Sequence, residues 1–330
     1  MNIQEKYILR SLEIAKKGIG LCAPNPAVGA VIVYDNKIIG EGFTSPFGGP
    51  HAEVNAINEV KDKSLLKQST LYVTLEPCAH QGKTPPCANL IVKYQIPKVI
   101  IGCIDPNPKV AGKGIKILKD NGCDVTTNVL EKECLRHHKR FFTFQNKKRP
   151  YIILKWAQCS NGFIAPLSKS QQQPFWISNK LSQQYVHKWR TEEQSILIGS
   201  KTALEDNPEL SARHYFGKNP VRFVIDNQNR LDKKMRVFNN ASLTYSLKSN
   251  NTKSVYDIVD QLYHKNMSSV IIEGGAKTLN SFIHENLWDE ARVFIGKIKL
   301  IKGVKCPEMT TKKFEEKKYL NDKLNIFYND

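Results

Sequence analysis

Strand-sized apolar runs alternate with helically periodic segments along most of this chain of 330 residues. Val28–Tyr34 and Lys98–Ile104 are two such apolar runs. Neither approaches the ~18 consecutive apolar residues of a membrane span, so we expect no membrane segment. Alternation of this kind is typical of layered α/β folds, in which helices cover the faces of a largely parallel sheet. The pattern therefore predicts an α/β protein.

A polar, basic run closed by proline, Phe144–Pro150, interrupts the alternation and marks a domain boundary. We place the boundary between residues 146 and 147, which predicts domains 1–146 and 147–330. Each part is long enough for its own core.

Thr310–Lys318 is expected to be a charged helix or turn. The predicted strands are Val28–Tyr34, Lys37–Gly42, Thr70–Leu75, Lys98–Ile104, Tyr151–Trp156, Ser195–Gly199, Val221–Ile225, Val270–Ile272 and Glu290–Ile295, and the predicted helices are His51–Val60, Cys87–Tyr94, Gly114–Asp120, Asn179–Arg190, Val255–His264 and Lys277–Glu285.

The N-terminal segment has the periodicity of an amphipathic helix that ends at Gly18. It lacks an apolar stretch followed by a small-residue cleavage site, so we expect a cytoplasmic protein rather than a secreted one. Eight cysteines in 330 residues do not indicate a disulfide framework.

The net charge of +18 raises the question of a nucleic-acid partner. Lysines outnumber arginines by 39 to 10 and are spread along the whole chain. Solvated surface charge, a polyanion-binding surface and binding of phosphorylated small molecules all fit this composition. We favour solvated surface charge and expect no nucleic-acid partner.

One constellation in the first domain has the residue types of a catalytic zinc site. His51, Cys78 and Cys87 supply one imidazole and two thiols, and a catalytic zinc takes three protein ligands and leaves a fourth position for water. Glu53, two residues after His51, is placed to move protons rather than to bind the metal. Each residue alone has an ordinary explanation, as a helix cap, a surface charge or a small core residue. Together they favour a catalytic site with one Zn²⁺ per chain.

The spacing of the cysteines narrows the class of enzyme. The pattern H-x-E followed by P-C is typical of zinc nucleobase deaminases, which usually have two residues between the thiols. Here eight residues separate Cys78 from Cys87. The intervening loop holds His80 and Lys83, both able to contact a phosphate or a substrate carbonyl.

Four segments together resemble the family of bifunctional riboflavin biosynthesis proteins, in which a diaminohydroxyphosphoribosylaminopyrimidine deaminase is fused to a 5-amino-6-(5-phosphoribosylamino)uracil reductase. They are Pro24–Gly29, His51–Glu53, the long cysteine loop and Asp105–Gly114. The resemblance covers nearly the whole chain. It implies a cytidine-deaminase-like three-layer N-terminal domain and a dihydrofolate-reductase-like C-terminal domain that uses NADPH.

In the deaminase half, the resemblance implies zinc binding by His51, Cys78 and Cys87, with Glu53 as the proton shuttle. It also implies that Asn25 holds the pyrimidine ring and that His80 and Lys83 contact the ribose phosphate. The family often has a histidine shortly after the Gly40–Gly42 hairpin, where this chain has Thr44.

In the second domain, the glycine pair Gly274–Gly275 directly follows a predicted strand and precedes a helix, an arrangement that lets backbone N–H groups approach a phosphate. A plain strand-to-helix turn has the same pattern. By position, the resemblance implies NADP contacts from Ala157, Trp176, Thr202, Asp206, Gly275, Ala276, Lys277, Thr278, Leu279, Asn280 and Ser281. It implies substrate contacts from Arg190, Leu210, Arg213 and Glu273.

Two departures from the family pattern fall in the reductase half. Asn161 stands where the family commonly has aspartate, and Pro174 replaces a serine before the tryptophan. We expect one side-chain contact near Pro174 to be lost or replaced by backbone.

These observations predict a two-step enzyme of riboflavin synthesis. It would deaminate 2,5-diamino-6-ribosylamino-4(3H)-pyrimidinone 5′-phosphate and then reduce the ribosyl chain with NADPH to give 5-amino-6-ribitylamino-uracil 5′-phosphate. We also expect a homo-oligomer. The alternatives are a tRNA adenosine deaminase with an appended domain, which the charge favours, and a structural zinc module, which does not explain Glu53.

Overall fold

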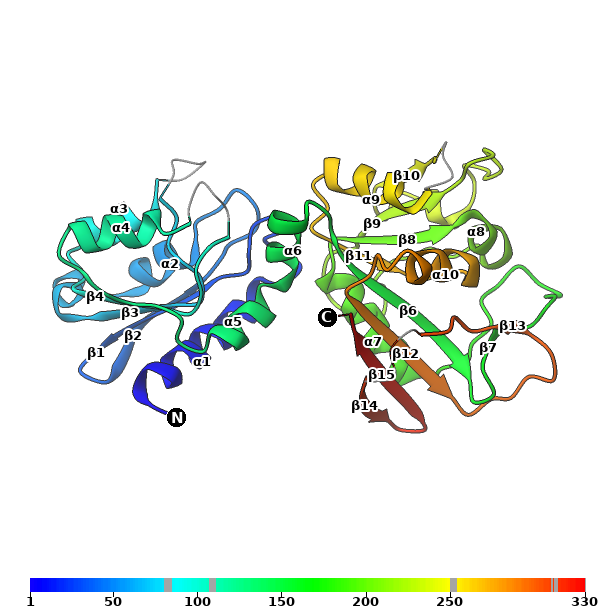
Figure 1. Ribbon diagram of the computed structural model, residues 1–330, viewed down its shortest axis with the longest axis horizontal. Helices are drawn as coiled ribbons and strands as arrows, with labels where there is room; N and C mark the ends of the chain where they lie inside the picture. The colour runs from blue at the N-terminus through cyan, green and yellow to red at the C-terminus, as the bar shows by residue number, and fades with distance from the viewer. Residues whose placement is uncertain (80–84, 107–110, 250–253, 310, 312–313, 330) are drawn as a thin grey trace. The chain divides into compact units, whose positions relative to one another are not determined.

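The computed structural model of the chain describes residues 1–79, 85–106, 111–249, 254–309, 311 and 314–329 (Figure 1). Two compact units divide between Lys148 and Arg149. The boundary expected at 146/147 falls in the last turn of a helix, α6 (Lys139–Lys147), so Phe144–Lys147 is helical rather than a linker. Both units are layered α/β structures, as the alternating pattern predicts.

The first unit is built on a five-stranded sheet in the order β2-β1-β3-β4-β5. β1 is antiparallel to β2 and β3, whereas β3, β4 and β5 are parallel. The strands are β1 (Gly29–Tyr34), β2 (Lys37–Phe43), β3 (Thr70–Val73), β4 (Lys98–Ile101) and β5 (Asp124–Thr126). The helices are α1 (Ile3–Ala15), α2 (Ala52–Glu59), α3 (Cys87–Lys93), α4 (Lys113–Asp120), α5 (Glu131–His137) and α6, with short 3₁₀ turns at Lys16–Gly18 and Lys63–Gln68.

Glycines on both faces of this sheet let helices pack closely against it. A Cβ on Gly29 would lie 1.9 Å from the Ser11 carbonyl oxygen of α1. A Cβ on Gly42 would lie 2.3 Å from the Ala52 carbonyl oxygen of α2. Ala30 pairs with Gly42 in the register, so Gly42 and Gly29 face opposite sides of the sheet. α1 and α2 therefore cover opposite faces, which gives the three layers that the family resemblance implies.

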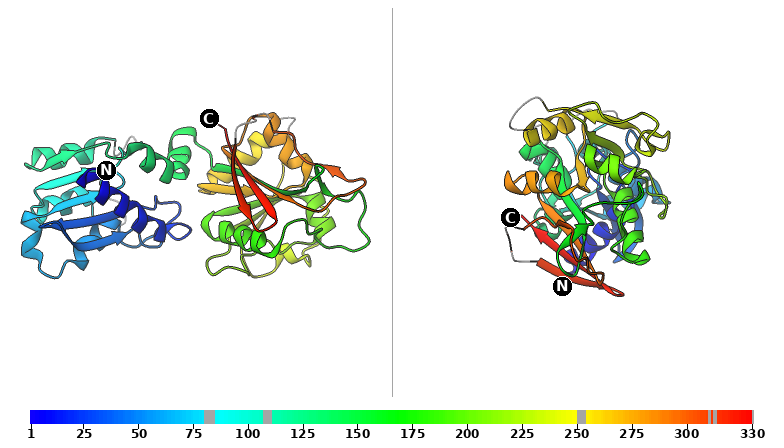
Figure 2. Two further views of the ribbon diagram at one scale, coloured as in Figure 1. Left: turned by 90° about the horizontal axis from the view of Figure 1, so that it is seen from below. Right: turned by 90° about the vertical axis from the view of Figure 1, so that its right-hand side faces the viewer.

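The second unit contains an eight-stranded sheet in the order β10-β9-β8-β11-β6-β12-β15-β14. Figure 2 shows the strands nearest the C-terminus in red. The strands from β10 to β12 run parallel, and β15 and β14 are antiparallel additions at one edge. These strands are β6 (Tyr151–Cys159), β8 (Ser195–Gly199), β9 (Val221–Ile225), β10 (Thr244–Leu247), β11 (Ser269–Ile272), β12 (Glu290–Gly296), β14 (Phe314–Tyr319) and β15 (Asp322–Tyr328), and a small second sheet pairs β7 (Phe163–Ala165) with β13 (Val304–Lys305). The helices are α7 (Lys180–Glu192), α8 (Ser200–Asp206), α9 (Ser254–His264) and α10 (Ala276–His284), with a 3₁₀ turn at Arg236–Phe238.

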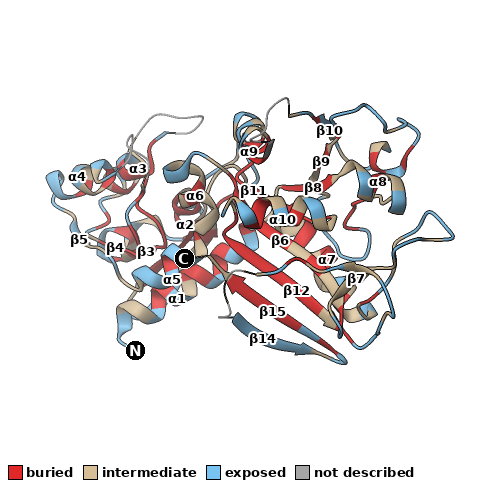
Figure 3. Cartoon of the chain, turned by 45° about the vertical axis from the view of Figure 1, so that its right-hand side comes forward, coloured by how far each residue is buried: buried red, intermediate tan, exposed pale blue. Residues whose placement is uncertain are grey.

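Alternate residues of β6 show how this sheet is covered on both faces. Ile152 and Leu154 belong to a core shared with α9 and α10, whereas Tyr151 and Ile153 belong to a core shared with α7 and α8. The two-residue period of a strand sends these neighbours to opposite faces. The central strands β6, β11 and β12 are accordingly buried, as Figure 3 shows.

The charged segment near the C-terminus differs from expectation. Thr310–Lys318 was expected to be a helix or turn, but Phe314–Tyr319 forms the edge strand β14, which is paired with β15 and almost wholly exposed (Figure 3). An exposed edge strand buries neither face fully, so its sequence lacks the apolar alternation that marks a strand. In the part of the chain described, no helix is long and apolar enough to cross a membrane.

Candidate active sites

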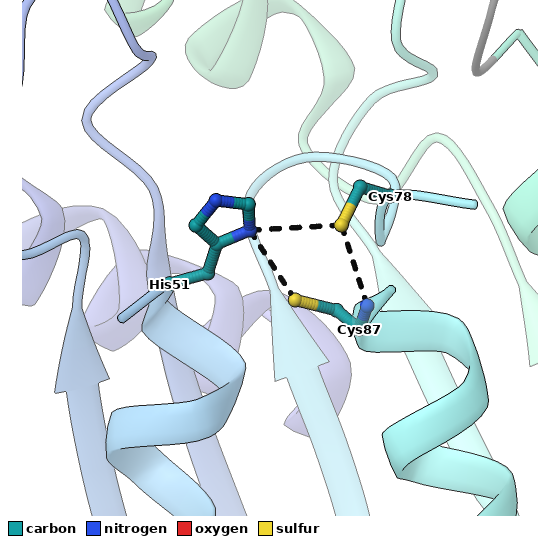
Figure 4. Close-up of side chains that lie close together, drawn as sticks. All are labelled: His51, Cys78 and Cys87. Atoms are coloured by element: carbon teal, nitrogen blue, oxygen red, sulfur yellow. Dashed lines mark hydrogen bonds between the residues drawn. The ribbon is translucent and has the colours of Figure 1, made fainter. Parts of the chain in front are cut away.

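Three potential metal ligands converge in the first unit (Figure 4). His51 Nδ1 lies 3.6 Å from Cys78 Sγ and 3.4 Å from Cys87 Sγ. The three ligand atoms all lie within 4.8 Å of one another. In a tetrahedral zinc site with ordinary Zn–N and Zn–S bonds, ligand atoms are about 3.6 Å apart. The donor set and its spacing therefore fit a zinc ion held by three protein ligands.

Helix termini place two of these three ligands. His51 immediately precedes α2, and its side chain makes no capping hydrogen bond that would compete for the imidazole. Cys87 is the first residue of α3, where the backbone N–H groups have no partner within the helix. Its own N–H donates to Cys78 Sγ at 3.3 Å. This hydrogen bond favours a thiolate at Cys78.

The contacts among the three ligands favour a cysteine thiolate, which is the form of cysteine that binds a metal. Hydrogen bonding from Cys87, together with His51, lowers the pKa of Cys78 to about 4. The hydrogen bond to Cys78 raises the pKa of His51. The same partner, with burial, raises the pKa of Cys87. One thiolate is thus formed readily, and a cation between the two sulfurs would stabilise the second.

Glu53 lies in the first turn of α2 and is only 4% exposed. Burial and the neighbouring Cys78 raise the pKa of its carboxyl group to about 7, although His51 opposes the shift. A carboxyl group poised near neutral pH is suited to both accept and donate a proton. Glu53 is not one of the three clustered ligands.

A buried carboxylate that the sequence analysis did not single out anchors the backbone beside Cys78. Glu76 is 3% exposed and accepts hydrogen bonds from four backbone N–H groups of one segment. The donors are Asp105 at 3.3 Å, Gly112 at 3.0 Å, Gly114 at 3.0 Å and Ile115 at 3.3 Å. Two of the donors lie in the first turn of α4, where a carboxylate is favoured. Glu76 thereby ties the end of β3 to α4, two residues before a zinc ligand.

We expect Glu76→Gln to weaken zinc binding. In the wild type, these backbone N–H groups donate to the Glu76 carboxylate. The glutamine NH₂ group would face some of them and leave them without an acceptor, which should lower the free energy of unfolding by about 1–3 kcal/mol. Zinc affinity, measured by competition with a chromophoric chelator, should fall, and the thermal midpoint should drop. Glu131→Gln, an exposed acid in the first turn of α5, is the matched control and should change neither. Unchanged zinc affinity in Glu76→Gln would contradict the anchoring role.

The remaining predicted residues of the deaminase half are placed as follows. Asn25 is half-buried, and its N–H donates to the Cys22 carbonyl at 3.0 Å. His80 and Lys83 lie outside the described residues. Thr44 is buried, and its hydroxyl accepts the N–H of Val28 at 3.0 Å, so it stabilises the Asn25 segment from within. His137 also reaches this segment, because its Nε2 lies 2.8 Å from the Ala27 carbonyl oxygen.

In the second unit, a cavity of about 1060 Å³ opens at the carboxyl ends of the parallel strands. This edge is the usual ligand-binding position in parallel α/β sheets. All the predicted reductase residues except Asn280 line it, and Asn280 lies on the exposed face of α10. The predicted residues that line the cavity are Ala157, Trp176, Arg190, Thr202, Asp206, Leu210, Arg213, Glu273, Gly275, Ala276, Lys277, Thr278, Leu279 and Ser281.

Two strand-to-helix turns meet at the centre of this cavity. The N–H of Gly199, at the end of β8, donates to the Gly274 carbonyl at 2.9 Å. A Cβ on Gly199 would lie 2.7 Å from Thr278 Oγ1, and one on Gly275 would lie 3.1 Å from Thr202 Oγ1. Glycine at both positions leaves backbone and threonine hydroxyls free to approach a ligand closely, as a dinucleotide phosphate requires.

A buried ion-pair network lies at the end of β11. Arg190 Nε and Nη2 donate to the two carboxylate oxygens of Glu273 at 2.9 and 2.8 Å, and Nη1 donates to the Ser211 carbonyl at 2.9 Å. Lys155, which the sequence analysis did not identify, lies 3.4 Å from the same carboxylate. Burial alone would raise the pKa of Glu273, but Arg190 and Lys155 lower it to about 2. The described residues therefore occupy three of the five N–H groups of Arg190, which leaves two for a ligand.

Two further predicted positions make contacts within the protein. Asp206 forms an ion pair with Lys169, which also lines the cavity. The side-chain amide of Asn161 donates to the carbonyl of Leu300 and accepts from its N–H. The asparagine that departs from the family pattern therefore holds two backbone segments together. Pro174 and the half-exposed Trp176 both line the cavity.

The fold and the two sites define a zinc-type deaminase unit joined to an α/β reductase unit. Residues 1–103 match the family model described as the cytidine and deoxycytidylate deaminase zinc-binding region. Residues 150–300 match the model described as the RibD C-terminal domain.

Relatives of known name cover both units. The riboflavin biosynthesis protein RibD of Aquifex aeolicus is 35% identical over 95% of this chain and 92% of the relative, and that of Escherichia coli is 32% identical over 88% and 87%. A crystal structure of a diaminohydroxyphosphoribosylaminopyrimidine deaminase/5-amino-6-(5-phosphoribosylamino)uracil reductase from Thermotoga maritima is 36% identical, with a TM-score of 0.89 over 98% of both chains. Acinetobacter baumannii RibD is 29% identical, with a TM-score of 0.86 over 98% of both chains.

The chain belongs to the RibD family of riboflavin biosynthesis proteins. It is a bifunctional enzyme with a deaminase and a reductase domain, as the sequence predicts.

Proposed function

We propose that the first unit deaminates 2,5-diamino-6-ribosylamino-4(3H)-pyrimidinone 5′-phosphate and that the second reduces the ribosyl chain of the product with NADPH. The observation that carries the deaminase assignment is the convergence of His51, Cys78 and Cys87 beside the buried carboxyl group of Glu53. A structural zinc module has no use for that carboxyl group.

In the deaminase site, His51, Cys78 and Cys87 would hold one zinc ion, which when bound makes a water molecule more acidic. Glu53 accepts a proton from water and delivers it to the exocyclic amine as the bond between this amine and its ring carbon breaks. Water supplies the new exocyclic oxygen on that carbon, and the amine leaves as ammonia. Asn25 is proposed to orient the pyrimidine, with His80 and Lys83 on the ribose phosphate.

In the reductase site, NADPH would supply a hydride to C1′ of the ribosyl chain. The bond between C1′ and the ring oxygen of the ribose would break, and this oxygen would take up a proton from solvent to become a hydroxyl group. The cofactor is proposed to lie across the two glycine turns, whose open backbone and threonine hydroxyls suit its phosphates. Its proposed contacts are Ala157, Trp176, Thr202, Asp206 and residues 275–281. Arg190, Leu210, Arg213 and Glu273 are proposed to hold the substrate, with Glu273 fixed in place by Arg190 and Lys155.

We also propose which molecules this enzyme binds and where in the cell it acts. The basic charge would serve phosphorylated small molecules rather than nucleic acid, and the enzyme would be a cytoplasmic homo-oligomer. Weak binding of tRNA at ~150 mM salt is the expected result, and tight binding with a steep salt dependence would contradict it.

Because each unit is proposed to carry one activity, we expect Cys87→Ala to abolish the deaminase activity and to leave the reductase activity. The variant should lose zinc and ammonia release, because two ligands cannot complete the site. It should still oxidise NADPH when the deaminated ribosylamino-uracil phosphate is supplied. Metal analysis, ammonia release and NADPH absorbance are the three measurements. Cys123→Ala, a thiol outside the ligand cluster, is the control and should keep all three. Loss of NADPH oxidation in a folded Cys87→Ala protein would overturn the two-site division.

A further inference from the structure

His187 is a buried side chain of the reductase cavity that none of the roles above uses. It lies in α7, three residues before Arg190, and is 3% exposed. It lines the cavity, and its Nδ1 is buried without a hydrogen-bond partner among the residues described. A buried polar atom without a partner is rare in folded proteins and often marks a ligand or ordered water that completes the site.

The surroundings of His187 are rich in cations. Its ring packs edge-on against His214 at 4.6 Å between centroids. Arg190 and Arg213 also act electrostatically on it. Glu273, the carboxylate that faces this group, already bonds Arg190 and Lys155.

In the described part of the chain, no salt bridge pairs Arg213 with a carboxylate. The carboxylate that acts on it is Glu209, which is paired with Arg236 at 3.2 Å. Arg190 and Arg236 both oppose the charge of Arg213. The three arginines line the same cavity as His187, whose Nδ1 has no partner among the described residues. An anion would stabilise this arrangement.

We propose that His187 is a positioning residue that, together with Arg213, binds a phosphomonoester dianion in the reductase cavity. A phosphate offers several acceptor oxygens, which suits the missing partner of the imidazole and the fork of the arginine. Two proposed ligands carry such a group, namely the 5′-phosphate of the substrate and the 2′-phosphate of NADPH. The inference rests on the proposed function of this unit, and its test separates those two sources.

The test replaces His187 with leucine and with asparagine. His187→Leu removes the donor, and His187→Asn restores an amide nitrogen close to the position of Nδ1. His264→Leu, an exposed histidine of α9, is the control. KM and kcat are measured with the ribosylamino-uracil phosphate and with its dephosphorylated form. The dissociation constants of NADPH and NADH are measured by fluorescence titration.

Loss of a hydrogen bond to a charged phosphate should weaken binding roughly tenfold or more. We expect His187→Leu to raise KM for the phosphorylated substrate by that factor, with kcat and the dephosphorylated substrate little affected, and His187→Asn to recover part of the loss. A tenfold increase in the dissociation constant of NADPH, with that of NADH unchanged, would instead assign the dianion to the 2′-phosphate of the cofactor. Equal changes for phosphorylated and dephosphorylated ligands, or no change, would overturn the proposal.

A second variant keeps the proposal testable if His187→Leu does not fold. Arg213 is exposed, and Arg213→Gln should fold normally. Inorganic phosphate should inhibit the wild-type reductase competitively and the Arg213→Gln enzyme at least tenfold more weakly. Equal inhibition of both enzymes would show that these residues do not bind the dianion. Failure of the proposed function would appear differently, as no NADPH oxidation by the wild type.

Discussion

Replacing Glu53 with glutamine is expected to abolish ammonia release while leaving about one zinc ion per chain. Glutamine keeps the size of the side chain but cannot take up and return a proton at the reacting water. General acid–base groups contribute typically 10²–10⁴-fold to the rate, so deaminase kcat should fall by at least that order. Zinc content should hold, because Glu53 is not among the three clustered ligand atoms.

The measurement pairs metal analysis with ammonia release on the diaminopyrimidine phosphate. Glu59→Gln is the matched control, since Glu59 lies in the same helix, six residues on, and is exposed. It should keep both zinc and activity. Glu53→Gln should also oxidise NADPH normally on the deaminated substrate. Loss of zinc from Glu53→Gln would show that the carboxylate is a ligand, and normal ammonia release would remove its role as a shuttle.

The zinc constellation could be predicted from the sequence because its elements are local. His51 directly precedes α2 and Glu53 lies in its first turn, and each cysteine follows a proline at the end of a strand or the start of a helix. Placing them together requires only that consecutive βα units are neighbours in the sheet. The strand Val221–Ile225 could be predicted for the same reason, because a strand or helix is marked by a periodicity within its own segment.

The groups that sequence reasoning missed depend on contacts between distant segments. Glu76 looks like an ordinary residue before Pro77, and only the fold brings the N–H groups of Gly112 and Gly114 to it. Lys155 is one of 39 lysines, and nothing local indicates that it meets Glu273, 118 residues away. The edge strand β14 was missed for a related reason, because its partner β15 rather than its own pattern holds it in place.

Replacing Glu273 with glutamine is expected to destabilise the second unit and to abolish most reductase activity. The carboxylate is the shared partner of Arg190 and Lys155, whose side chains are 10% and 15% exposed. Removing one member of a buried ion network leaves uncompensated charge and costs roughly 3–5 kcal/mol. The free energy of unfolding, measured with urea, should fall by that order. Glu285→Gln, at the more exposed end of α10, is the matched control and should change little.

The same substitution should alter the dependence of stability on pH. Glu273 has a folded pKa of about 2 against an ordinary value of 4.5. A depressed carboxyl pKa contributes stability that is fully present above the unfolded value and is lost as the pH falls through the folded value. The difference in unfolding free energy between wild type and Glu273→Gln should therefore be constant at neutral pH and shrink between about pH 4.5 and 2. A difference that stays constant over this range would show that Glu273 stabilises the unit by packing rather than by charge.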